Sequence, residues 1–269
     1  MKLYLDPGHG GTDPGAQGNG LKEKDINLDI ALKIRNLITN QYENVSVKMS
    51  RTSDATKSLN QRTNEANAWG ADYFVSIHCN SFNGSARGYE DYIHSALSDS
   101  SQTAKYRNIL HEEITSVNRL QNRGKKKANF HVLRESSMPA ILSENGFIDN
   151  AQDAALMRDA SWRQTVAQGH VNGIARAFNL KRKESSPSPS PTSIYRIIAG
   201  SFQAKNNAEG RVAFLKKENI NSFVDSITIS GKVWYRVQAG AFENRDNAEN
   251  HLAKVKRYVP DAFIIQEQR

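Results

Sequence analysis

The amino-acid sequence predicts an α/β protein made of two units, the larger of which has a mixed, twisted sheet with helices on both faces. Within the first 180 residues, short apolar and β-branched runs alternate with longer segments of helical periodicity. Near the C-terminus a strand–helix–strand pattern occurs twice, which predicts a small βαββαβ domain of ferredoxin-like architecture. A segment of alternating serines and prolines separates the two parts.

The first 80 residues are expected to contain three strands and two helices. The first helix places Ile26, Ile30 and Ile34 on one face, as helical periodicity requires. The second helix begins at Ser58, an N-cap residue, and ends at Gly70, which favours the left-handed conformation that closes helices. The expected strands are residues 2–6, 45–51 and 72–80, and the expected helices are residues 25–42 and 58–70.

The remainder of the larger unit is expected to contain three more strands and two more helices. Apolar or β-branched runs indicate the strands, and amphipathic spacing indicates the helices. The expected strands are residues 88–94, 130–134 and 139–145, and the expected helices are residues 106–120 and 161–180.

The C-terminal segment repeats itself at an offset of 40 residues, because YRIIAGSF at 195–202 returns as YRVQAGAF at 235–242. Each copy predicts a strand, a helix and a second strand, and together they form a four-stranded sheet backed by two helices. The aromatic residues of the repeat are expected in the core, and four polar residues either offer donors to a ligand or simply solvate the outer face. The aromatic residues are Tyr195, Phe202, Tyr235 and Phe242, and the polar residues are Arg196, Gln203, Arg236 and Gln238.

Domain bounds follow from the sequence KRKESSPSPSPTS at residues 181–193. This segment has no apolar anchor and cannot bury enough surface to fold, so it is predicted to be a semi-extended linker. The predicted domains are therefore residues 1–180 and residues 194–269.

The composition is that of a soluble globular protein. Hydrophobic residues make up 38% of the 269 residues, and no apolar run approaches the about 20 residues that a membrane span needs. The N-terminal sequence MKLYLDPGHG lacks the apolar core of a secretory signal. The single cysteine, Cys79, excludes an internal disulfide and a thiolate zinc cage. No dimerisation feature is visible, so a monomer is expected.

The positive charge of the chain is concentrated in its last third. Residues 1–180 hold 21 basic and 19 acidic residues, whereas residues 181–269 hold 15 basic and 9 acidic residues. An excess of this kind indicates a polyanionic partner, either nucleic acid or an anionic wall polymer.

Three side chains are candidate zinc ligands. His9 follows the first expected strand, Glu23 precedes the first long helix, and His78 lies near the end of the third strand. Ligands of open α/β sheets gather beyond the carboxyl ends of strands, so these segments can converge there. Two imidazoles and a carboxylate form a catalytic zinc set with one open position. Each residue alone also has an ordinary structural interpretation, as a turn histidine or as a carboxylate that complements a helix dipole.

Glu144 closes another apolar strand, immediately before a glycine-containing turn. A carboxylate there can take a proton from water beside a metal, or it can simply bond a loop amide. Cys79 alternates with His78 along its strand, so it is expected to pack inward as an inert thiol. His111 and His170 fall within helical patterns and are expected to be packing or surface residues, His131 is less easily assigned, and His94 is the remaining histidine of this part.

Four motifs, LDPGHGGTDPGA, LKEKDINL, SIHCNS and PAILSENGFIDN, occur in this order within residues 1–180. Together they resemble the zinc-dependent N-acetylmuramoyl-L-alanine amidases of the amidase type 3 family. The resemblance implies that His9, Glu23 and His78 bind Zn²⁺ and that Glu144 is the catalytic carboxylate. Cys79 departs from the family pattern, which commonly has an apolar or small residue there, and this departure adds an oxidisable thiol without changing the ligand assignment.

Residues 194–269 resemble the SPOR domain, a peptidoglycan-binding module, through the YRVQAGAF motif and the doubled architecture. This resemblance implies binding to glycan strands, particularly those without stem peptides. The whole arrangement is similar to sporulation-associated autolysins that lyse the mother cell of Gram-positive spore formers. A phage endolysin of the same layout is the alternative.

The reaction implied by the resemblance is hydrolysis of the amide between N-acetylmuramic acid and the L-alanine of the stem peptide. A zinc peptidase that cuts within the stem peptide is the nearest alternative, and a wall-binding regulator with an inactive catalytic unit is another. RNA binding is disfavoured because the aromatic strand signature of RNA-binding ferredoxin-like domains is missing. The enzyme is expected to be made in the cytoplasm and to act on the cell wall after release.

Overall fold

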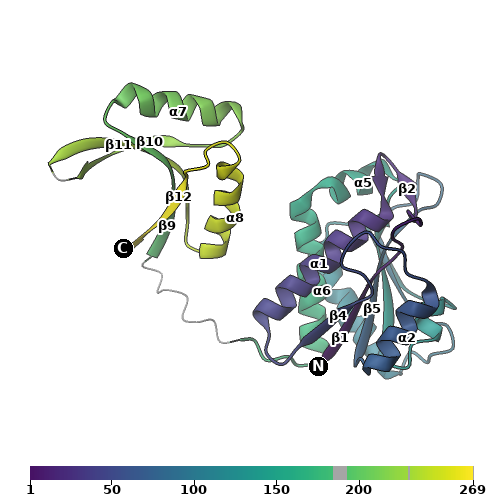
Figure 1. Cartoon of the computed structure of the whole chain (residues 1–269). Coiled ribbons are helices and arrows are strands. Elements are labelled where there is room, and N and C mark those ends of the chain that lie inside the picture. The colour runs from purple at the N-terminus through teal and green to yellow at the C-terminus, as the bar shows by residue number, and fades with distance from the viewer. Residues whose placement is uncertain (184–192, 230, 269) are drawn as a thin grey trace. The chain divides into compact units, whose positions relative to one another are not determined.

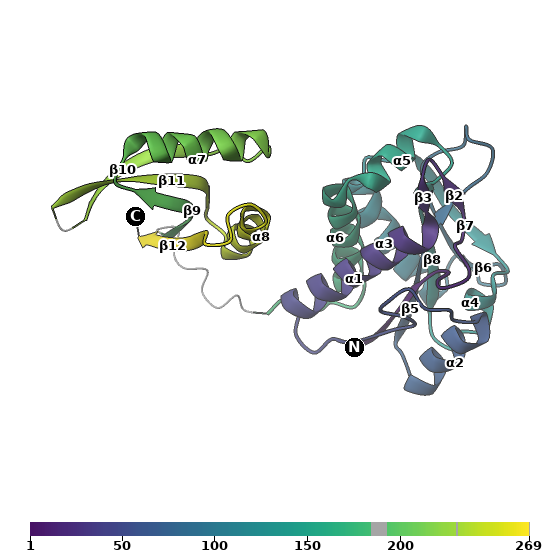
Figure 2. The same cartoon turned by 45° about the horizontal axis from the view of Figure 1, so that its top comes forward.

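The computed structural model describes residues 1–183, 193–229 and 231–268. The chain divides into two compact units, Met1–Lys183 and Glu184–Arg269. Each unit has its own sheet and its own helices (Figures 1 and 2). The predicted α/β class with a second, smaller sheet domain is therefore confirmed.

The larger unit is built on a six-stranded mixed sheet. Its strands are β1 (Lys2–Pro7), β4 (Ser46–Met49), β5 (Tyr73–Asn80), β6 (Tyr89–His94), β7 (Asn122–Ala128) and β8 (Ala140–Phe147). They are ordered β4–β1–β5–β8–β6–β7. The first four in this order are parallel, β6 runs antiparallel to β8, and β7 runs parallel to β6. Because β1, β5 and β8 are parallel neighbours, their carboxyl ends meet at one edge of the sheet.

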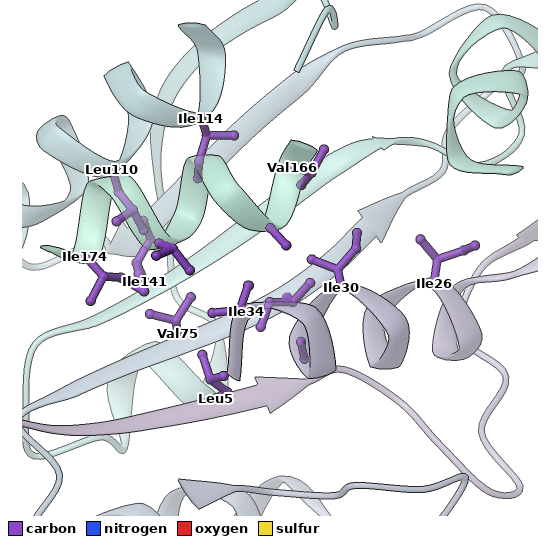
Figure 3. Close-up of a cluster of buried hydrophobic side chains, with 14 of the residues drawn as sticks. Leu5, Ile26, Ile30, Ile34, Val75, Leu110, Ile114, Ile141, Val166 and Ile174 are labelled. Carbon is purple, nitrogen blue, oxygen red and sulfur yellow. The ribbon is translucent and has the colours of Figure 1, made fainter. Parts of the chain in front are cut away.

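Three long helices, α1 (Glu23–Gln41), α3 (Gln102–Val117) and α6 (Ala160–Ala177), cover one face of this sheet (Figure 2). The isoleucines spaced along α1 are buried against strand residues such as Leu5 and Val75 (Figure 3). Each fully buried side chain of this kind contributes about 1.5–3 kcal/mol to folding. The amphipathic pattern thus fixes α1 with its first turn, and hence Glu23, at the carboxyl edge of the strands.

The opposite face is covered by α2 (Leu59–Trp69) and by a short helix, α4 (His131–Arg134). The predicted start and end of α2 are confirmed. The Ser58 side chain accepts from the backbone N–H of Gln61 while the Gln61 side chain accepts from the N–H of Ser58, and Gly70 closes the helix with a φ of 65°.

The prediction of a strand over residues 130–134 is wrong, since His131–Arg134 forms one helical turn. Val132 and Leu133 are adjacent in sequence and are both buried, whereas Phe130 remains 40% exposed. A single turn is too short to display a helical repeat, so the alternation of apolar residues imitated a strand.

Four further elements were absent from the sequence-based expectation. The edge strand β7 has the sequence NRGKKKA, in which apolar and polar residues do not alternate. Lysine-rich sequences are typical of edge strands, where they prevent pairing with other chains. The helix α5 (Ala151–Arg158) has only eight residues and is started by the Asn150 side chain, which accepts from the backbone N–H groups of Gln152 and Asp153. A two-stranded ribbon, β2 (Gln17–Gly18) and β3 (Leu21–Lys22), leads into α1.

The helical histidines His111 and His170 are buried structural residues, as expected. His111 bonds Asp91 through Nδ1 at 2.7 Å. His170 donates from Nδ1 to the carbonyl of Val166 at 2.9 Å, and its Nε2 lies 3.0 Å from the hydroxyl of Ser143. Burial lowers the pKa of His170 to about 4, so this imidazole is neutral at physiological pH.

The smaller unit is a four-stranded antiparallel sheet backed by two helices (Figure 1). Its elements are β9 (Ser193–Phe202), α7 (Lys205–Lys217), β10 (Phe223–Ile229), β11 (Lys232–Phe242), α8 (Arg245–Lys256) and β12 (Phe263–Gln268). The strand order β10–β11–β9–β12 is that of a ferredoxin-like fold. As predicted, the repeated aromatic residues belong to the core: Tyr195 is 5% exposed, and Phe202, Tyr235 and Phe242 pack against the buried cluster.

The predicted linker covers residues 181–193, of which 184–192 lie outside the described residues. Its first residues contact the larger unit: the N–H of Glu43 donates to the carbonyl of Lys181, and the N–H of Lys183 donates to that of Gln41. Ser193 begins β9. In the part of the chain that the structure describes, no helix is long and apolar enough to cross a membrane.

Candidate metal centre

The turn after β1 is shaped for close approach of two imidazole rings. His9 has a φ of 61°, a left-handed conformation that is costly for most side chains. A Cβ on Gly8 would lie 2.2 Å from Cε1 of His78. Glycine at this position therefore allows the rings of His9 and His78 to meet edge to face, with centroids 5.1 Å apart.

His9, Glu23 and His78 come together as the sequence predicted. One ligand atom from each residue lies within 4.8 Å of the other two. Nε2 of His9 is 3.1 Å from Oε2 of Glu23, and Nδ1 of His78 is 2.9 Å from Oε1 of Glu23. Glu23 is the first residue of α1 rather than a residue before it. The carboxylate therefore stands between the two imidazoles.

The Glu23 carboxylate is buried and held from several sides. Oε2 accepts from the backbone N–H of Ala16 at 2.8 Å, and Oε1 accepts from the N–H of Cys79 and from Nδ2 of Asn27, each at 3.1 Å. Burial raises the pKa of Glu23, but hydrogen bonds and charges from His78 and His9 outweigh it and hold that pKa well below the usual range. Glu23 is thus an anion that is ready to bind a cation.

His9 is oriented by Asp13, whose Oδ2 lies 2.8 Å from Nδ1 of the ring. A carboxylate in this position accepts the Nδ1 proton and leaves Nε2 directed toward Glu23. Carboxylates commonly orient metal-binding histidines in this way. Burial lowers the pKa of His9, but Glu23 and Asp13 raise it more, so the net shift is upward.

Two buried arginines fix the backbone around the histidine turn. Arg62 donates from Nη2 to the carbonyl of His9 at 2.7 Å and pairs with the buried carboxylate of Asp6 at 2.6 Å. Arg51 donates from Nη2 to the carbonyls of Gly8, at 2.9 Å, and Lys24, at 2.7 Å.

Those two carbonyls belong to the neighbours of His9 and Glu23. A single nitrogen of Arg51 therefore joins the two segments that carry these side chains. Asp13, Arg51 and Arg62 were not among the residues predicted for the site. Only Asp13 left a signal, because it lies inside the same glycine-rich motif as His9.

Glu144 lies on β8, where it is the register partner of His78 on β5 and of Glu90 on β6. Its Oε2 is buried and has no hydrogen-bond partner among the described residues. Burial, with smaller contributions from the charges of Glu23 and Glu90, raises the pKa of Glu144 well above its usual value, and Lys126 opposes this shift only in part.

A cavity of about 500 Å³ connects these groups. Glu144, His9 and His78 line it on the strand side, and apolar side chains from α2 and α4 line the other. Leu59 and Phe130 stand at this apolar side and are 54% and 40% exposed. The cavity therefore combines a charged edge with an apolar wall.

The other candidates have different places. His131 lines the cavity at the start of α4, but its buried Nε2 has no partner among the described residues. His94 is half-buried, and Nε2 of its ring lies 3.2 Å from Oδ1 of Asn129. Cys79 is 2% exposed and packs in the core, as predicted, and burial raises its pKa well above the usual value.

The fold and the site together define a class of protein. An α/β sheet that gathers two imidazoles and a carboxylate at its strand ends, with a second carboxylate in the same cavity, has the donor set of a catalytic zinc hydrolase. The family model described as N-acetylmuramoyl-L-alanine amidase matches residues 3–176, and the SPOR domain model matches residues 191–266. The chain belongs to this amidase family, whose members hydrolyse the cell wall, and carries a peptidoglycan-binding SPOR domain.

Several known proteins are similar to this chain. The N-acetylmuramoyl-L-alanine amidase CwlM of Bacillus licheniformis and the sporulation-specific N-acetylmuramoyl-L-alanine amidase of Bacillus subtilis are each 48% identical over 83% of this chain and 84% of their own length. The endolysin of Bacillus phage SPP1 is 45% identical over 70% of this chain and 69% of its own. The solved catalytic domain of CwlV from Bacillus (Paenibacillus) polymyxa is 33% identical, with a TM-score of 0.63 over 67% of this chain and 99% of that domain.

Proposed function

We propose that this chain is a zinc-dependent hydrolase that cleaves the amide between N-acetylmuramic acid and the L-alanine of the stem peptide. The observation that carries the proposal is the meeting of His9, Glu23 and His78 beside a cavity that the two histidines line together with Glu144. Oε2 of Glu144 has no hydrogen-bond partner among the described residues. These side chains come from four separate segments, which the parallel strands bring to one edge of the sheet.

The donor set suits zinc. Two imidazole nitrogens and one carboxylate oxygen are borderline ligands that zinc binds in catalytic sites, and they leave a fourth position open. His9, Glu23 and His78 would hold the ion. When bound, zinc supplies Lewis acidity, which activates water and polarises carbonyl groups.

Glu144 supplies the proton transfers. Its unpartnered Oε2 accepts a proton from the attacking water and then passes it to the alanine nitrogen as the amide bond breaks. This second transfer is necessary because an amine anion is a poor leaving group. Glu23 does not compete for this role, since hydrogen bonds and the two histidines hold its pKa low.

The test is the analysis of fragments released from purified peptidoglycan. The full-length chain should release peptides that begin with L-alanine and leave glycan strands whose N-acetylmuramic acids carry free lactyl carboxylates, as measured by mass spectrometry. A chelator should stop the release, and added zinc should restore it. Fragments cut between stem amino acids would instead identify a zinc peptidase, and binding without any cleavage would identify a regulator.

The biological role proposed for the chain is that of a sporulation autolysin that acts on the mother-cell wall after release. The relative from Bacillus subtilis named as sporulation-specific covers 83% of the chain, including part of the SPOR region, and favours this role over that of an endolysin. Deletion of the coding sequence in its host should leave mother-cell walls intact after spore formation. If phage-induced lysis were impaired instead, the chain would be an endolysin.

We also propose that the open sheet face of residues 194–269 binds glycan. Nη1 of Arg196 donates to Oε1 of Gln238 at 2.8 Å, and its Nε pairs with Glu267 at 2.6 Å, so the group is fixed in place. Nε of Arg236 is buried without a hydrogen-bond partner among the described residues. Gln203 lies beyond the end of β9 and is exposed. Fixed polar groups of this kind suit sugar hydroxyl and acetamido groups.

Removal of residues 193–269 should weaken wall binding without affecting bond cleavage. The expected result is reduced co-sedimentation with insoluble peptidoglycan, because the sheet that carries Arg196 and Gln238 is lost. Release of amine from soluble wall fragments should remain at the full-length level. Unchanged sedimentation of the truncated chain would show that the larger unit itself is responsible for wall binding.

Arg51→Lys should weaken zinc binding while retaining the positive charge. Arg51 also donates from Nε to the carbonyl of Pro7 at 3.1 Å and from Nη1 to that of Ser53 at 3.2 Å. These bonds hold Nη2 against the carbonyls of Gly8 and Lys24. Lysine has one nitrogen and cannot make all of these bonds, so His9 and Glu23 lose their common support. The expected loss of zinc affinity is about 10-fold or more by chelator competition. Arg35→Lys is the matched control, since Arg35 is a half-buried residue of α1 whose guanidinium bonds the side chain of Asn36. Equal zinc affinities of the two variants would contradict the prediction.

A further inference from the structure

A second, shallower groove lies next to the candidate metal centre. Its volume is about 210 Å³ and its lining includes Asn80, Phe82, Glu90, Arg123 and Phe147. Strand geometry makes it the continuation of the site. Asn80 is two residues beyond His78 on β5, so both side chains share a face, and Glu90 is the register partner of Glu144.

The floor of this groove is charged and rigid. The carboxylate of Glu90 is 2% exposed, and it accepts from Nδ2 of Asn80 at 2.9 Å and from Nε of Arg123 at 2.7 Å. The guanidinium carbon of Arg123 lies 4.8 Å from the ring centroid of Phe147. A planar guanidinium held on two sides in this way keeps its remaining N–H donors in a fixed direction.

The rim of the groove carries an exposed aromatic ring. Phe82 is 77% exposed, yet its loop is firmly held, because Oδ2 of Asp149 accepts from the N–H of Phe82 at 3.0 Å and from that of Gly84 at 2.8 Å. Asn150 adds a bond from Nδ2 to the carbonyl of Gly84 at 3.0 Å. The backbone that carries the ring is therefore held in place, while the ring itself stays exposed.

This combination suits a sugar ring. The apolar face of a pyranose packs on an aromatic side chain, and its hydroxyl and acetamido groups bond planar polar groups held in place beforehand. Arg123 and Lys126 share the carboxylate of Glu90, so both of these cations already have an ionic partner. The exposed ring of Phe82 beside these paired groups favours a sugar over a stem peptide. The larger cavity, with its apolar wall of Leu59 and Phe130, remains for the peptide.

We propose that the groove beside Phe82 and Arg123 is a sugar subsite that holds an N-acetylated sugar of the glycan strand next to the cleaved amide. This rests on the proposed function. A bond between a sugar and a peptide needs a binding site for the sugar on one side of the metal centre and a binding site for the peptide on the other. The groove thereby sets the direction in which the substrate lies across the sheet edge.

The test compares two soluble substrates with the same tetrapeptide stem. One carries the disaccharide of N-acetylglucosamine and N-acetylmuramic acid, and the other carries only a D-lactoyl group. Phe82→Ala should raise KM for the disaccharide substrate about five- to tenfold with kcat unchanged, in keeping with the loss of one aromatic contact. KM for the lactoyl substrate should not change. Phe82→Tyr, which keeps the ring, should behave as wild type.

Phe214→Ala is the matched control, since Phe214 is an exposed aromatic residue (43%) on α7 of the smaller unit. The proposal is overturned if Phe82→Ala leaves KM for the disaccharide substrate unchanged, or raises KM equally for both substrates. A wild-type chain that releases no amine from either substrate would refute the proposed function instead.

If neither substrate is cleaved, binding to the groove is measured directly. The affinity of the full-length Glu144→Gln chain for the peptide-free disaccharide is determined by calorimetry. Adding Phe82→Ala should weaken this binding by the same factor. Equal affinities with and without the substitution would overturn the proposal independently of catalysis.

Discussion

Replacement of Glu144 by alanine is expected to abolish cell-wall cleavage while zinc content and wall binding stay at wild-type levels. The side chain lines the cavity beside His9 and His78 but is not among the three groups whose ligand atoms meet. Losing a general acid–base group costs about 10²–10⁴ in rate, and here one carboxylate serves both transfers, so the upper part of this range is expected. Amine release from purified peptidoglycan measures the loss.

Glu144→Gln distinguishes the loss of proton transfer from the loss of side-chain volume. Glutamine has the size of glutamate but cannot accept and return a proton, so it should be as inactive as alanine. Zinc content by metal analysis and sedimentation with peptidoglycan are the internal controls. Cleavage retained by either variant would show that another group transfers the proton, and loss of zinc from both would show that Glu144 is a ligand.

The core of the site was predictable because its residues lie in segments with strong local patterns. His9 and His78 each follow an apolar run whose only stable position is a buried strand, and parallel strands bring their carboxyl ends together. Glu23 begins a helix whose isoleucines can pack on only one face. Burial of apolar surface thus fixes where these polar groups lie, and their convergence follows from topology.

The supporting residues were not predictable because their roles depend on backbone atoms. Arg51 and Arg62 bond carbonyls of the histidine turn, and every residue has a carbonyl, so no spacing in the sequence marks the partners. The edge strand β7 was missed for a related reason. It is held by backbone pairing with β6. Lys125 and Lys127 are exposed and Lys126 pairs with Glu90, so the sequence shows no hydrophobic period.

The second unit was predictable to a greater degree because its sequence repeats. The offset of the motif assigned two strands of the sheet at once, and those strands, β9 and β11, are neighbours in the structure. The groove beside Phe82, in contrast, could not be predicted from the sequence. It depends on Asp149, which is distant in sequence and bonds the loop through two backbone N–H groups.

Loss of either histidine of the metal centre is expected to remove zinc and activity together. For His78, alanine is the appropriate replacement, because the residue lies in a regular strand. For His9, asparagine is better than alanine, since the φ of 61° favours asparagine over other non-glycine residues. Loss of a direct ligand should cost more affinity than the about 10–100-fold typical of an outer partner. Zinc stoichiometry after dialysis and amine release are measured on the same samples.

His94→Ala is the matched control, because this histidine is half-buried and does not line the cavity. It should keep both zinc and activity. The comparison with Glu144 tests the assignment of the two histidines as metal ligands. Variants of His9 and His78 should lose zinc and turnover together, whereas variants of Glu144 should lose turnover alone. If His78→Ala retained full zinc while activity fell, His78 would be a proton-transfer group, and the ion would have to be held by a different set of side chains.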